Sequence, residues 1–86
     1  NIPKAVVRKV ISLEETIDNL TKRITTGLRM KFSDFASVHK EEKVNIIVSF
    51  LAMLELVKQG VIHVTQENHF GDINMETKEV GVPRYN

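Results

Sequence analysis

The feature that most constrains this chain is an almost continuous apolar segment from Val44 to Val57, which only three polar side chains interrupt. The segment falls short of the roughly 20 residues that a membrane-spanning helix needs. Two glutamates precede it and Gly60 follows it, so the pattern predicts a helix from Lys40 to Gln59 that begins with favourable acidic charge and ends at a glycine. Such a helix is apolar around more of its circumference than a one-sided surface helix requires.

The apolar side chains of this predicted helix fall into two neighbouring stripes when residues are placed 100° apart. One stripe contains Ile47, Leu51 and Leu54, the other contains Ile46, Phe50, Met53 and Val57, and the plainly polar sector contains Asn45 and Ser49. Two interpretations follow. Either the helix is the centre of a small domain and is covered on both sides, or part of the second stripe is exposed and binds another protein.

A second helix is predicted to begin after Ser12, because Ser12 and Glu15 have the capping-box spacing. It should end near Gly27 and lie on the core by one stripe, since apolar residues recur every three or four positions at Leu13, Ile17, Leu20, Ile24 and Leu28.

The remaining signals are short. They predict a strand at Met30–Phe32, a helical turn at Ser33–Ser37, a strand at Val61–Thr65, a loop at Glu67–Gly71 and a return strand at Asp72–Met75. This order predicts a mainly helical α+β fold, the winged helix-turn-helix, with three helices and a small β-hairpin wing. Residues 12–75 would form the domain, with 1–11 as a linker or arm and 76–86 as a tail. One domain is what 86 residues allow.

Charge argues against nucleic acid as the direct partner. The net charge is only +1, the predicted third helix offers no arginine, and the wing segment is acidic, whereas DNA-reading helices and wings carry basic side chains. The alternative function is a DNA-binding regulator of the winged-helix class. Its phosphate contacts would come from Lys22, Arg23, Arg29 and Lys31.

Catalysis finds little support in the sequence. His39, His63 and His69 lie in different predicted elements without metal-ligand spacing, the glycines are scattered, and there is no cysteine. We therefore predict no catalytic residue, no metal site, no cofactor and no enzyme activity. The chain has no signal-like segment and begins at Asn1, so we expect a cytoplasmic protein and a fragment of a longer one.

Phe70, in the predicted wing, is either a plug for the core or an exposed anchor for a partner. Under the docking interpretation, the predicted partner-binding residues are Ile46, Phe50, Met53, Leu54, Val57 and Phe70.

Two blocks of the sequence resemble a known family. Residues 49–58 (SFLAMLELVK), followed by 65–67 (TQE) and 70–73 (FGDI), resemble the C-terminal domain of the bacterial kleisin ScpA, segregation and condensation protein A. The similarity extends from about Ser12 to Ile73.

The resemblance implies a winged-helix domain that docks on the ATPase head of an SMC protein. The whole kleisin would bridge two heads and close a ring around chromosomal DNA, in chromosome condensation and segregation at the nucleoid. ScpB would bind a central segment that this chain lacks. Contact with DNA would then be indirect, through the complex, and no membrane would be involved.

Overall fold

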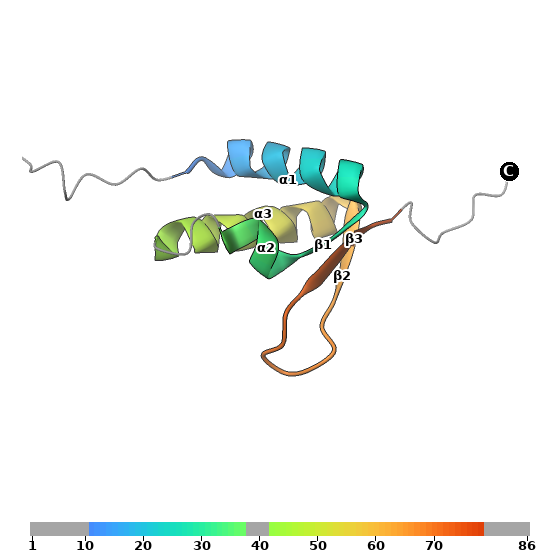
Figure 1. Cartoon of the computed structure of the whole chain (residues 1–86). Coiled ribbons are helices and arrows are strands. Elements are labelled where there is room, and N and C mark those ends of the chain that lie inside the picture. Colours follow the sequence, from blue (N-terminus) through green and yellow to red (C-terminus); the bar gives the residue numbers. More distant parts are fainter. Residues whose placement is uncertain (1–10, 38–41, 79–86) are drawn as a thin grey trace, which may run out of the picture.

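The computed structural model describes residues 11–37 and 42–78 (Figure 1). The predicted arm (except Ile11), Lys40, Glu41 and most of the predicted tail lie outside these residues. Among the described residues, no helix combines the length and the apolar character needed to cross a membrane.

Helix α1, Leu13–Gly27, begins and ends where the sequence predicts. The backbone N–H of Glu15 donates to Ser12 Oγ at 3.3 Å, which is the serine half of the predicted cap. Leu20 and Ile24 are fully buried. The two terminal leucines of the predicted stripe, Leu13 and Leu28, are instead exposed, so only the middle of the stripe lies on the core.

Strand β1, Arg29–Lys31, and helix α2, Phe32–Ala36, follow α1 directly. The strand lies one residue earlier than predicted, because Phe32 already begins the helix while its N–H donates to the carbonyl of Ile73 at 2.8 Å. Phe35 and Ala36 place α2 on the core, where both are buried.

Helix α3 spans Lys43–Gln59 and ends at Gly60, whose φ of +80° is the left-handed conformation that glycine adopts most easily. Glu42 has an extended backbone and stands before the helix. Helix α3 thus begins three residues later than predicted, with Glu42 as its N-cap residue at the positive end of the helix dipole.

Strands β2, Ile62–Thr65, and β3, Asn74–Thr77, form the wing and pair with β1 in the order β1-β3-β2, antiparallel throughout. The return strand lies two residues later than predicted. Its pairing begins only at Asn74, opposite both Lys31 and Thr65.

Figure 1 shows α1 lying along α3, with the sheet at one end of both helices and the loop between β2 and β3 projecting away from them. The buried core joins all these layers through Leu20, Ile24, Phe35, Met53, Leu56, Ile62 and Met75. Three helices and a small antiparallel sheet confirm the predicted winged-helix class of the α+β fold.

Candidate docking face on the third helix

The outward side of α3 is apolar. At 100° per residue, its exposed apolar side chains occupy an arc of about 120°. The large apolar members of this arc, with their exposed fractions, are Ile47 (57%), Leu51 (46%), Val44 (44%), Leu54 (43%) and Phe50 (38%). We call these five residues the outer arc. An isolated soluble domain gains nothing from such a contiguous surface, which is typical of an interaction site.

The inward side of the same helix contains polar residues. Asn45 and Ser49 are 3% and 0% exposed and lie beside Ala52, Met53 and Leu56. Asn45 Oδ1 accepts the backbone N–H of Ile11 at 3.0 Å, and Ser49 Oγ donates to the carbonyl of Asn45 at 2.9 Å. Because these polar groups have partners, burying them carries no penalty for an unmade hydrogen bond.

Helix α3 is therefore inverted relative to an ordinary surface helix. Its buried sector includes polar side chains, while its exposed sector is apolar between Lys43 at one end of the helix and Lys58 at the other. Burial in the folded chain alone does not account for this distribution.

The structure divides the predicted partner-binding residues of α3. Phe50 and Leu54 lie on the outer arc, and Ile46 and Val57 are half-buried at its edge, Val57 packing against the core. The prediction for Met53 is wrong, because this side chain is 1% exposed and belongs to the core.

Three members of the outer arc were missed: Val44, Ile47 and Leu51. The stripe of Ile47, Leu51 and Leu54 is visible in the sequence, but the exposed surface was predicted on the other stripe. The signal that could have found them is the four-residue spacing of Asn45 and Ser49. A serine hydroxyl can bond the carbonyl four residues earlier and can then be buried.

Phe32 extends the outer arc from α3 onto α2. Its ring meets that of Phe50 edge to face, with centroids 5.8 Å apart and an interplanar angle of 88°. This geometry is a favoured one for aromatic pairs. The contact fixes the position of Phe50 at one border of the arc and joins the two helices into one apolar surface.

Phe70 lies at the tip of the wing and is fully exposed. Of the two alternatives considered for it, the core plug is wrong. Its φ of +62° is unusual for a bulky side chain. The loop around it is closed by Gln66 Nε2, which donates to the carbonyl of Gly71 at 2.6 Å. Phe70 is thus presented to solvent by an ordered turn.

The base of the wing is fastened to α2 by Asp72. Ser33 Oγ donates to Asp72 Oδ2 at 2.5 Å, and the N–H groups of Ser33 and Ile73 donate to Oδ1 at 3.3 and 2.8 Å. The Ser33 hydroxyl is the main reason why the pKa of Asp72 lies below its ordinary value. We call this set of bonds the Asp72 clamp.

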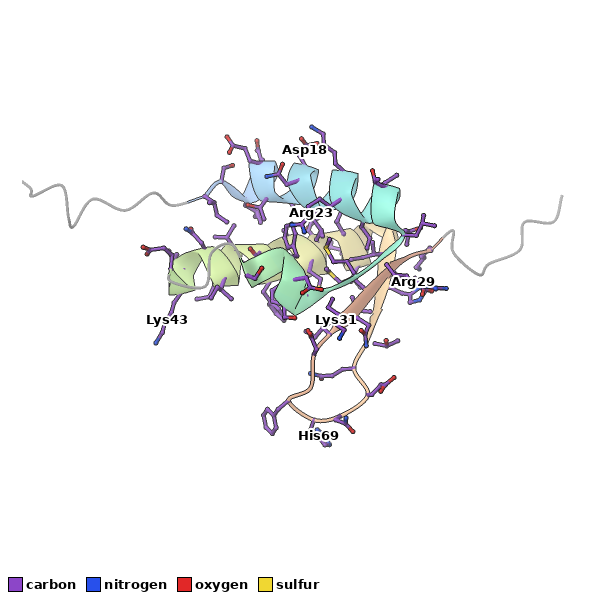
Figure 2. The ribbon with its side chains drawn as sticks, in the orientation of Figure 1. Asp18, Arg23, Arg29, Lys31, Lys43 and His69 are labelled. Atoms are coloured by element: carbon purple, nitrogen blue, oxygen red, sulfur yellow. The ribbon has the colours of Figure 1, made fainter. Side chains whose placement is uncertain are left out.

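Three of the four cations that the DNA-binding alternative would use contact partners within the domain. Figure 2 labels Arg23, Arg29 and Lys31 among these four. Lys22 pairs with Asp18 at 2.9 Å, Arg29 Nε lies 2.6 Å from Glu76 Oε2, and the Arg23 guanidinium lies over the Phe35 ring. Glu76 also contacts His63 Nε2 at 3.2 Å across the sheet. In residues 11–37 and 42–78, no three His, Asp or Glu side chains gather into a group that could hold a metal ion.

The fold and this surface together define a winged-helix domain whose third helix exposes large apolar side chains to solvent. Comparison with known proteins gives the family. The sequence model for segregation and condensation protein ScpA matches residues 2–77, and the chain belongs to this family. The resemblance identified from the sequence is thereby confirmed.

Individual relatives agree with this assignment. The chain is 32% identical over 72 residues to segregation and condensation protein A of Macrococcus caseolyticus, covering 84% of this chain and 30% of that protein. It is 36% identical over 76 residues to the protein of the same name from Clostridium perfringens strain 13, covering 83% and 30%. The chain thus spans about a third of the length of these relatives.

Proposed function

We propose that this chain is the C-terminal winged-helix domain of a kleisin and that it docks on the ATPase head of an SMC protein through the outer arc of α3. One observation carries the proposal. The third helix places satisfied polar groups inside and five large apolar side chains outside. Membership of the ScpA family supports the choice of partner.

The size of the surface is adequate for a specific contact. Each outer-arc side chain is already about half-buried, so covering the rest contributes on the order of 1 kcal/mol per residue. Five such residues, with Phe32 and surrounding contacts, provide the apolar centre that protein interfaces use. Phe70, if it reaches the same partner, adds an aromatic anchor of the kind enriched among residues that dominate binding energy.

In the whole protein, this domain would supply one end of a bridge between two SMC heads. The other end and the segment that binds ScpB would belong to the part of the relatives that this chain does not span. Such a bridge acts in chromosome condensation and segregation at the nucleoid. The domain itself contributes attachment, while ATP hydrolysis belongs to the SMC head.

The alternative function, direct DNA reading, is disfavoured by the outer arc. The side chains available on it for bases are hydrophobic, and arginine, the commonest base-contacting residue, is absent from the described part of α3.

Two titrations test the proposal. Isothermal titration of the chain with a purified SMC head should give a saturable complex with micromolar or tighter affinity. The same chain titrated with duplex DNA should bind only weakly, with an affinity that falls steeply as salt rises. The proposed function would be refuted if the chain does not bind the SMC head, or if it forms a specific DNA complex at physiological salt.

A further inference from the structure

Two lysines mark the ends of the outer arc. Lys43 is the first residue of α3 and Lys58 is its penultimate residue, and both are exposed. On the helical projection both fall within the same sector of about 120° as the five apolar residues, since fifteen positions bring the helix to within about 60° of its starting direction. Their Cα atoms are about 22 Å apart along the axis. The apolar residues of the arc lie between them.

Neither lysine has a charge partner within the described chain. The described ion pairs use other cations. The nearest acidic side chain in the sequence of α3, Glu55, accepts a hydrogen bond from Gln59 Nε2 at 2.8 Å. Lys43 also stands at the positive end of the helix dipole, where a cation destabilises the helix. Helix stability therefore does not explain why a lysine occupies the first position of α3.

We propose that the partner surface receiving α3 is an apolar strip with a carboxylate near each end, spaced to meet Lys43 and Lys58. This inference rests on the proposed function, because it describes the surface of the SMC head that the outer arc would meet. An apolar contact is non-directional and tolerates sliding. Two charges about 22 Å apart do not tolerate it, since a slip of one helical turn would separate both pairs.

The first experiment is zero-length cross-linking with a carbodiimide, which joins an amine to a carboxylate only where the two are in contact. In the complex of the whole chain with the SMC head, mass spectrometry should find Lys43 and Lys58 joined to two different acidic residues of the head. Lys22, on the outward side of α1 and paired with Asp18, is the internal control and should form no such link. Lys43→Arg and Lys58→Arg should bind normally and lose their links. Abundant links from Lys22, with none from Lys43 or Lys58, would overturn the inference.

The second experiment reverses the charges. Lys43→Glu with Lys58→Glu should raise the Kd for the head about tenfold at low salt, mainly by slowing association. Lys22→Glu reverses one charge on α1, half the change of the double variant, and should alter the Kd less than twofold. The salt dependence of the double variant should be weaker than that of the unaltered chain.

The outcomes separate the two proposals. If the unaltered chain binds the head and the double variant binds equally well at every salt concentration, the carboxylate-flanked strip is wrong and the docking function stands. If the unaltered chain does not bind the head, the docking function fails and the inference fails with it. Circular dichroism of each variant checks folding, which replacement of two exposed side chains should preserve.

Discussion

The two long helices of this domain pack on one another but differ in which kinds of side chain they bury and which they expose. The middle of helix α1 follows the ordinary rule, with Leu20 and Ile24 buried and the Asp18–Lys22 pair outside, and Thr16 is its one buried polar residue. Helix α3 breaks it, with Asn45 and Ser49 buried and Ile47 and Leu51 outside. The comparison teaches that residue polarity alone does not decide which face is buried. What decides it is whether each polar group finds a partner inside, and what else will cover the apolar face.

The sharpest test of this contrast uses neighbours in α3. Met53→Arg places a charge in the core and should unfold the domain, because an unpaired buried charge costs several kcal/mol against a total stability of about 5 to 15. Leu54→Arg, one residue later on the outer arc, should leave the helical circular dichroism spectrum unchanged. A folded Met53→Arg variant would place Met53 outside the core and contradict the fold.

The next test compares the same truncation in the two helices. Leu20→Ala in α1 should lower the free energy of unfolding by about 2 to 5 kcal/mol, because it leaves a cavity. Leu51→Ala in α3 should lower it by less than about 1 kcal/mol, since that side chain is already half-exposed and alanine favours the helix. Urea denaturation measures both values. Equal losses of unfolding free energy in the two variants would show that the outer arc is part of the core.

A smaller effect distinguishes the two buried polar residues. Asn45→Ala removes the acceptor of the Ile11 N–H and should cost about 1 to 3 kcal/mol. Ser49→Ala should change stability by no more than about 0.5 kcal/mol, since it deletes a donor to a carbonyl that remains within the helix and gains helix propensity. Thermal melts report both. A large loss for Ser49→Ala would mean that its hydroxyl serves a partner beyond Asn45.

The smallest effect concerns the Asp72 clamp. Its carboxyl pKa lies below the ordinary value of 3.8, so the clamp contributes stability above that pH and loses it as pH falls through the lowered pKa. The free energy of unfolding of the unaltered chain should therefore fall as the pH drops below about 4, partly because the clamp is lost. Asp72→Asn should remove that part of the fall. Ser33→Ala, which removes the main cause of the shift, should do the same to a lesser degree. If both variants and the unaltered chain show the same dependence of unfolding free energy on pH, the clamp does not form in solution.

Much of the fold was predictable because its signals are local. The cap at Ser12, the stop at Gly60 and the β-branched run before the wing each act within a few residues, and these elements lie close to their predicted positions. The return strand was misplaced by two residues, in a stretch where Asp72 and Ile73 contact Ser33 and Phe32 from a distant part of the chain. No pattern within the wing alone carries that information.

The candidate site was half-predictable for a related reason. The excess of apolar surface on α3 is visible in the sequence, and Phe50 and Leu54 were identified from it, while Phe70 was identified from its place in the predicted wing. Which sector faces outward depends on the backbone groups that Asn45 and Ser49 reach, one of them in a segment 34 residues away. Met53 was misplaced, and Ile47 was overlooked, because the polar sector was assumed to face water.

The central claim, that the outer arc of α3 is a docking face, is tested most directly by Ile47→Arg, at its most exposed position. Binding to a purified SMC head and thermal unfolding are measured on the same sample, with Thr26→Arg on the exposed side of α1 as the matched control. The account predicts that both variants melt close to the unaltered chain. Thr26→Arg should keep its affinity, while Ile47→Arg should weaken binding by about a hundredfold or more, because the interface would bury an unpaired charge. A folded Ile47→Arg variant that binds the head as tightly as the unaltered chain would contradict the account.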